Sequence, residues 1–146
     1  MLFRSGQLAA FDFYESNSLW THTAGNWTGA VTVTGANQQG GQLVITGTAG
    51  NTIAAGDKFS LANVNMVNPM TRRSAGPLTL RTFTCPAGFT LTGGSDTISI
   101  LPPIYGPGSQ YQNVDSLPAA NAALTLWPGT TTPSGKSGTE IGRAHV

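Results

Sequence analysis

The residues with the most suggestive chemistry lie near the carboxyl end, where Gly129 to Ser137 reads Gly-Thr-Thr-Thr-Pro-Ser-Gly-Lys-Ser. A phosphate-binding loop follows a strand and ends in Gly-Lys-Ser or Gly-Lys-Thr, because its backbone N–H groups and its lysine hold the phosphates. Here five residues separate the two glycines, where the motif has four. Pro133 also removes an N–H group, and no apolar helix pattern follows. We interpret the segment as a polar loop.

Acid–base chemistry is a second possibility, because Asp12 and Glu15 lie close together near the amino end. A general acid and a general base need environments that separate their pKa values, and no nucleophile or paired site is near them in the sequence. His22 could act as a base only beside a nucleophilic serine, and the chain lacks the glycine pattern that presents such a serine. We therefore expect solvated carboxylates and a histidine that only forms hydrogen bonds.

Metal and redox chemistry have few residues to work with. The chain contains one cysteine, Cys85, and two histidines. That set excludes an internal disulfide and is too small for a zinc site of His and Cys ligands. We therefore expect no catalytic, cofactor-binding or metal-binding residue in this chain. The sequence predicts that the protein is not an enzyme.

The charges are sparse, since charged residues make up 9% of the chain and the formal net charge is +1. Without a basic stripe there is no long-range field to recruit nucleic acid or an anionic membrane, so we expect no specific nucleic-acid binding. No stretch approaches the ~18 apolar residues of a membrane span, and no secretion signal begins the chain. The sequence favours a soluble, intracellular protein that does not associate with a membrane.

Arg72 and Arg73 are the exception to this sparse charge. Two adjacent cations on an exposed loop either only favour solubility or pair with acids of a neighbouring subunit, and we treat them as a possible intersubunit contact. Four aromatic residues are typical of core or interface anchors when no basic residues accompany them; they are Trp20, Trp27, Tyr105 and Tyr111. A carbohydrate-binding or adhesin-like β-domain, the alternative function, requires such rings to lie together on one exposed face.

The elements that must position these residues are β-strands. The 19 glycines and 9 prolines, together with frequent threonine, favour short strands joined by tight turns. Val31 to Thr34 and Leu43 to Thr46 alternate apolar and polar residues around a glycine-rich loop, as in a hairpin. Phe89 to Thr92 and Thr97 to Leu101 predict a second hairpin. Pro102-Pro103 should end it, because proline cannot continue a ladder.

Other segments complete the expected sheet. Phe59 and Leu61 share one strand face by the period of two, Leu78 to Thr84 alternates clearly, and Leu124 to Trp127 resembles another strand. Asn63 to Pro77 is too irregular for a helix and predicts a surface excursion. About six short strands are typical of a small antiparallel β-barrel. Its expected core residues are Val31, Val33, Leu43, Ile45, Phe59, Leu61, Leu80, Ile98 and Ile100.

The two ends can be back-translated into the two strands of one DNA duplex. Glu140 to Val146 can be written as a common sequencing-library adapter read in frame, and Met1 to Ser5 as part of its reverse complement. Two unrelated protein termini would rarely share this property. We therefore interpret residues 1–5 and 140–146 as adapter-derived scars, and residues 6–139 as an internal fragment of a longer protein.

A series of segments, in order and spacing, resembles the insertion domain of the major capsid (coat) protein of short-tailed phages of the P-twenty-two type. The resemblance extends along most of residues 6–139, and its specificity lies in the combination, because no single segment is a catalytic signature. The matching segments are Leu8 to Asp12, Val31 to Ala36, Ala55 to Val64, Thr97 to Ile104 and Tyr111 to Val114.

The resemblance implies a structural protein with the HK-ninety-seven-like shell fold, into which a six-stranded antiparallel β-barrel is inserted. Residues 6–20 would connect from the shell fold, 21–105 would form the barrel, and 106–139 would return to the shell fold through irregular flanking segments. In that family the insertion stabilises the subunit and influences capsid size.

A long barrel loop in that family also reaches neighbouring capsomers. The corresponding hairpin here, Ala36 to Gly41, is short and carries no charge, so Asn63 to Pro77 replaces it as the candidate. The implied partners are other copies of the coat protein, a scaffolding protein and a portal protein. The implied location is the virion capsid, and the host cytoplasm during assembly.

Overall fold

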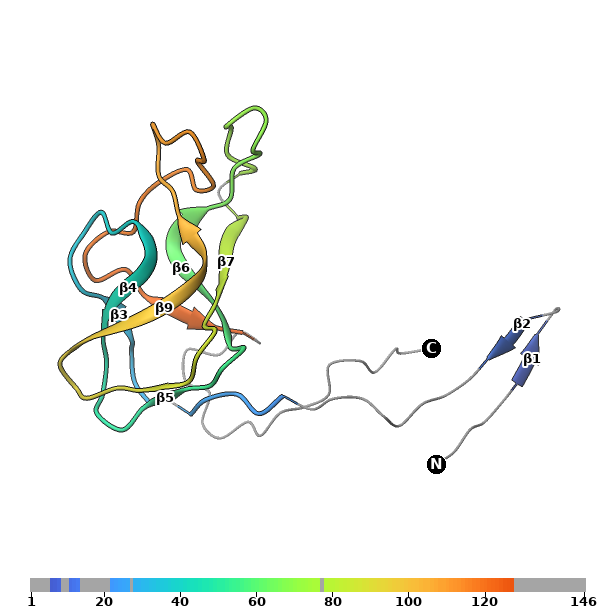
Figure 1. Ribbon diagram of the computed structural model, residues 1–146, viewed down its shortest axis with the longest axis horizontal. Coiled ribbons are helices and arrows are strands. Elements are labelled where there is room, and N and C mark those ends of the chain that lie inside the picture. Colours follow the sequence, from blue (N-terminus) through green and yellow to red (C-terminus); the bar gives the residue numbers. More distant parts are fainter. Residues whose placement is uncertain (1–5, 9–10, 14–21, 27, 77, 128–146) are drawn as a thin grey trace. The chain divides into compact units, whose positions relative to one another are not determined.

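The computed structural model describes residues 6–8, 11–13, 22–26, 28–76 and 78–127. Within these residues the structure has β-strands and no helix (Figure 1), which confirms the expected all-β class. The described residues from Ala24 to Trp127 belong to one compact unit. A short antiparallel hairpin of β1 (Gly6–Leu8) and β2 (Phe11–Phe13) belongs to another.

Six strands of the larger unit form one sheet in the order β10-β6-β7-β9-β4-β3, and each neighbouring pair is antiparallel. A separate two-stranded antiparallel sheet pairs β5 (Thr52–Ile53) with β8 (Phe89–Thr90). The strands of the main sheet are β3 (Thr32–Val33), β4 (Gly40–Thr46), β6 (Lys58–Asn65), β7 (Leu80–Thr84), β9 (Ser95–Ile104) and β10 (Leu124–Leu126).

Backbone hydrogen bonds join the two outer strands of this sheet. Val33 N–H donates to the Ala122 carbonyl oxygen at 2.9 Å, and Leu124 N–H donates to the Val31 carbonyl oxygen at 2.9 Å. Residues 121–123 lead directly into β10, so the sheet curls until its first and last strands meet, as in a barrel. The prediction of a small six-stranded antiparallel barrel is confirmed, although β7 and β9 share only the pair Thr84 and Leu101.

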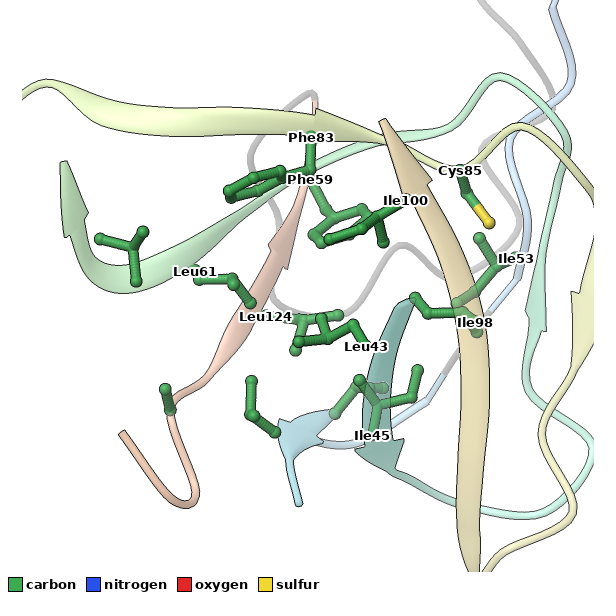
Figure 2. Close-up of a cluster of buried hydrophobic side chains, with 14 of the residues drawn as sticks. Leu43, Ile45, Ile53, Phe59, Leu61, Phe83, Cys85, Ile98, Ile100 and Leu124 are labelled. Carbon is green, nitrogen blue, oxygen red and sulfur yellow. The ribbon is translucent and has the colours of Figure 1, made fainter. Parts of the chain in front are cut away.

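Alternating side chains of the strands fill the interior of the barrel (Figure 2). Phe59 and Leu61 are both fully buried, as the period of two predicts. Of the nine expected core residues, all except Leu80 are buried. The core also contains side chains that the sequence prediction left out, namely Ile53, Val64, Phe83, Cys85, Leu91, Ile104, Val114, Ala122, Leu124 and Leu126.

Leu80 is a correction to the expected core, because it is only half-buried. The strand β7 begins at Leu80, so Leu78 lies before it and is 94% exposed. Leu80 pairs with Asn65 beyond a register shift between β6 and β7. The inward side chain of this strand is Phe83, which pairs with Phe59.

The expected second hairpin is wrong, because β8 pairs with β5 while β9 pairs with β4 and β7. The predicted turn exists, since the Asp96 carboxylate accepts hydrogen bonds from the backbone N–H and the hydroxyl of Thr92 at 2.9 and 2.7 Å. The strand that precedes the turn is bound elsewhere. Leu91 N–H donates to the Asn51 carbonyl oxygen at 2.8 Å, and Gly50 N–H donates to the Leu91 carbonyl oxygen at 2.9 Å.

Pro102 and Pro103 do not end their strand, because β9 continues to Ile104. Gly40 pairs with Ile104 and Gln42 with Ser99, so the register shifts opposite the two prolines. Proline is tolerated at such an irregularity, where the ladder needs no N–H donor from it.

Two segments differ in extent from the expectation. The excursion predicted for Asn63 to Pro77 starts later, because β6 runs to Asn65 and Val67 is also buried. The predicted strand near Leu124 is confirmed as β10. It lies in the range 106–139, where a return connection was expected, so part of that range belongs to the sheet.

Candidate functional site

Two loops lie side by side at one end of the barrel, and we call residues 66–76 and 105–115 together the tip (Figure 1). The first loop follows β6 and the second follows β9. Met66 forms an isolated antiparallel bridge with Val114, and Val67 N–H donates to the Asn113 carbonyl oxygen at 3.3 Å. Loops that are far apart in sequence therefore present one surface.

The first loop holds Arg72 and Arg73 in a defined turn. The side-chain oxygen of Asn68 accepts hydrogen bonds from Met70 N–H at 2.9 Å and Thr71 N–H at 3.3 Å. Arg72 N–H donates to the Asn68 carbonyl oxygen at 2.7 Å, and Asn68 N–H donates to the Arg73 carbonyl oxygen at 2.9 Å. The backbone that carries both arginines is thus fixed by local hydrogen bonds.

Both guanidinium groups are on the surface, since Arg72 and Arg73 are exposed. Arg72 Nη2 lies 3.5 Å from the Gln110 carbonyl oxygen, which places it against the second loop. Within the part of the chain that the structure describes, no ion pair joins either arginine to a carboxylate. The two cations predicted as a possible intersubunit contact are therefore available to an external partner.

Asp115 fastens the base of the tip by accepting four hydrogen bonds. The donors are the backbone N–H and side-chain amide of Asn65, both at 2.9 Å, and the hydroxyls of Ser74 and Ser116 at 3.2 and 3.1 Å. Burial alone raises the pKa of Asp115, but these hydrogen bonds outweigh it and hold the pKa below its ordinary value of 3.8. The carboxylate ties the end of β6 to both loops.

Large apolar side chains are also exposed on the tip. Met70 is 92% exposed and Tyr111 is 69% exposed. The ring of Tyr111 lies 6.0 Å from that of Tyr105, with an interplanar angle of 51°. Trp20 and Trp27 lie outside the described residues, so the alternative of a carbohydrate-binding or adhesin-like face stays a prediction.

At the other end of β6, the incoming and outgoing segments of the barrel bind consecutive residues. Gly25 N–H donates to the Asp57 carboxylate at 2.9 Å, and Trp127 N–H donates to the Lys58 carbonyl oxygen at 2.8 Å. We call Gly25, Asp57, Lys58 and Trp127 the clasp. The sequence alone did not indicate this role of Asp57, because Gly25 lies 32 positions away in the chain.

Further contacts fix the incoming segment. A Cβ atom on Gly25 would lie 2.1 Å from the Thr52 carbonyl oxygen, so only glycine fits there. Thr28 N–H donates to the Asn51 side-chain oxygen at 3.0 Å, and the Asn51 amide donates to the Thr28 carbonyl oxygen at 3.0 Å. The chain is therefore already bound to the barrel before β3 begins.

The thiol of Cys85 is buried and has a structural role. Burial raises the pKa of the Cys85 thiol, which donates to the Ala87 carbonyl oxygen at 3.0 Å, so thiolate nucleophilicity is disfavoured. Among the described residues, no group of three or more His, Cys, Asp or Glu side chains is placed to hold a metal ion. No helix in that part of the chain is long and apolar enough to cross a membrane.

Several sequence candidates fall outside what the structure describes. Neither the segment Gly129 to Ser137 nor Glu15 is among the described residues, and the side chain of Asp12 is not described. His22 is described and half-buried, and it takes part in an interaction of its own. The absence of an enzyme active site therefore stays a prediction.

Comparison with known proteins gives a structural likeness and no match in sequence families. No protein-family model matches the chain, and no curated protein matches it. A solved structure described as the CUS-3 coat protein I-domain is 26% identical, with 68% of this chain and 96% of that chain covered and a TM-score of 0.46. This score is below the level that establishes a shared fold, so the function proposed below rests on the residues and contacts of this chain.

Proposed function

We propose that this chain contains the insertion domain of a tailed-phage major capsid protein of the P-twenty-two type. Its role is structural: the barrel stabilises the subunit of a longer, self-assembling shell protein and contributes contacts between subunits. The proposal rests on the segments whose order and spacing resemble that family, and on the clasp, which is the observation that carries it.

A domain inserted into another fold must receive and return the chain at nearly the same place. The clasp meets this requirement, because Gly25 and Trp127 bind the neighbouring residues Asp57 and Lys58. The more than one hundred residues between Gly25 and Trp127 form the barrel, and the chain leaves the barrel close to the place where it entered. A host fold would then need only a small gap to accommodate the module.

The rest of the assignment follows from this role. Residues 6–20 and the part of 106–139 beyond β10 would connect to an HK-ninety-seven-like shell fold. The partners would be other copies of the coat protein, with scaffolding and portal proteins, and no cofactor or catalysis is needed. The location would be the virion capsid, and the host cytoplasm during assembly. Arg72 and Arg73 would contact a neighbouring subunit.

The direct test is to recover the longer reading frame from the source DNA, express it and examine the product by electron microscopy. We expect regular shells, and a longer protein that never assembles into shells would refute the proposed function.

A second test isolates the insertion itself. Residues 24–127 are grafted into a surface loop of an unrelated host protein, and the melting of host and graft is followed. The host should stay folded. A matched graft of residues 24–105, which lacks β10 and half of the clasp, should destabilise it. Equal behaviour of the two grafts would show that the clasp does not close the module.

A further inference from the structure

We propose that Arg81, in the wall of the barrel, binds the oxyanion group of a small ligand, either a carboxylate or a phosphate. This inference goes beyond the proposed function, because it assigns a ligand site to the barrel itself and does not depend on assembly into a shell. The observation behind it is a partly buried guanidinium group that has no partner among the described residues.

Arg81 lies near the start of β7, on the strand face that points into the barrel. By the period of two it shares this face with Phe83, and Cys85 continues the same row just after the strand. Phe83 and Cys85 belong to the buried core (Figure 2), whereas Arg81 is half-buried. The inward row of this strand therefore ends in a cation where an apolar side chain would be expected.

The guanidinium group of Arg81 is removed from water on one side without compensation. Its Nε–H is buried and has no acceptor, while the two Nη nitrogens, which also lack a partner, are open to solvent. A buried donor without an acceptor destabilises the folded state, and a partly desolvated charge adds to that cost. Folded proteins keep few such groups, and those that they keep are concentrated at functional sites.

The described acids of the larger unit do not neutralise this cation. Each of their carboxylates accepts hydrogen bonds from other groups, and no hydrogen bond or ion pair joins any of them to Arg81. The donors are Gly25 and Ala54 for Asp57, Thr92 for Asp96, and Asn65, Ser74 and Ser116 for Asp115. An anion that pairs with Arg81 must therefore come from outside the described residues.

The open end of the guanidinium group determines the class of ligand. The two Nη atoms present parallel N–H groups, which fit two oxygens of a carboxylate or of a phosphate group. Because water reaches the cation from one side only, an anion at this end is attracted more strongly than at a fully hydrated arginine. A nucleic acid backbone needs many cations, so one isolated arginine suits a small ligand better.

The direct test follows the Nε–H signal of Arg81 by nuclear magnetic resonance in the 146-residue chain. Burial protects this proton from exchange with water, so the signal should be observable. Sodium phosphate and sodium acetate are added in separate titrations, with sodium chloride at the same ionic strength as the reference. We expect a shift that saturates with phosphate, with acetate or with both, and that chloride does not produce. A response to one anion alone would assign the site to that group.

Substitutions separate anion binding from a structural role of Arg81. Arg81→Met puts an apolar side chain in place of the unpaired donor, so the urea midpoint of the anion-free chain should rise. An anion that binds the folded chain raises the midpoint further, but phosphate also stabilises proteins without binding. The measured quantity is therefore the extra rise in the wild type, which Arg81→Met should abolish. Arg81→Lys loses the paired donors and should weaken binding several-fold.

The matched control is Arg73→Met, which removes an exposed arginine and should change neither the anion-free midpoint nor the response to anions. An Arg81 signal that does not move, or a shift that chloride reproduces, would overturn the inference. So would an anion-free midpoint that is lower for Arg81→Met than for Arg73→Met, because the barrel itself would then satisfy Arg81. These results would leave the proposed function intact, since the experiment needs no shell.

Discussion

Replacing Phe59 with alanine tests how the barrel is held together. Phe59 lies on β6 between its paired neighbours Phe83 on β7 and Leu126 on β10, and all three side chains are buried. The Phe59 and Phe83 ring centroids are 5.9 Å apart at an interplanar angle of 33°. The substitution removes a ring that three adjacent strands share.

The expected loss follows from this burial. Phe-to-Ala changes in closely packed cores cost about 3–5 kcal/mol of unfolding free energy, because a cavity remains where the ring was. The aromatic pair adds about 0.5–1.5 kcal/mol, which places Phe59→Ala in the upper part of that range. Small domains have a total stability of about 5–15 kcal/mol, so most of the margin is lost.

Urea unfolding of the 146-residue chain, followed by circular dichroism, measures the effect. With a denaturant dependence of about 1–3 kcal/mol per molar urea, the midpoint should fall by on the order of 2 M. The matched control is Leu78→Ala, which removes a 94% exposed leucine and should change stability by less than about 0.5 kcal/mol. If the two variants have the same midpoint, our assignment of the core is wrong.

Three further predictions concern the clasp, the tip and the ends. Gly25→Ala should destabilise the barrel, because its Cβ would lie 2.1 Å from the Thr52 carbonyl oxygen; Gly35→Ala, at a position with open space but a positive φ, is the control, and a smaller loss at Gly25 in urea unfolding would contradict the clasp. Since the folded-state pKa of Asp115 is lowered, its contribution to stability is present above the unfolded-state pKa and is lost as pH falls through the folded-state pKa. Asp115→Asn should therefore be less stable than the wild type at neutral pH, and the difference in stability between the two proteins should become smaller as the pH falls. Urea midpoints measured from neutral to acid pH check this, and a difference that does not change with pH would refute this role. Trimming residues 1–5 and 140–146 should change stability by less than about 0.5 kcal/mol in thermal melts, and the trimmed chain should stay monomeric by light scattering; a larger loss would contradict their interpretation as scars.

The local alternation of side chains was enough to predict most of the barrel core. Val33, Leu43, Ile45 and Ile98 point inward as predicted, because the period of two fixes the face of a strand once one side is buried. The class of fold followed from the same signal. This alternation does not indicate which strand pairs with which.

The failures are accordingly failures of pairing. A turn at Gly93 suggested that β8 and β9 form a hairpin, yet β8 pairs with β5, and Leu91 just after it binds Asn51, forty residues earlier. Pro102 and Pro103 continue within β9 because the opposite strand shifts its register there. Both outcomes depend on tertiary contacts that no local pattern encodes.

The candidate site, too, was predictable from the sequence only in part. The two arginines stood out in the sequence because charge is scarce, so their exposure was predictable. Tyr111 and Asp115 joined the tip only when the second loop folded beside the first. The clasp was invisible for the same reason, since Gly25, Asp57 and Trp127 are separated by 32 and 70 positions.

The way the outer strands meet has a consequence for synthesis on the ribosome. A nascent chain that has reached residue 105 contains β3 and β6, but both partners that these strands need on their open sides, residues 121–123 and β10, are still to be translated. Until then each strand exposes unpaired backbone groups, which are a template for association between chains. Closure needs contacts between residues some ninety positions apart in sequence, and such non-local contacts form slowly. During translation, crowded polysomes that make many copies of this protein would therefore hold incomplete barrels next to one another.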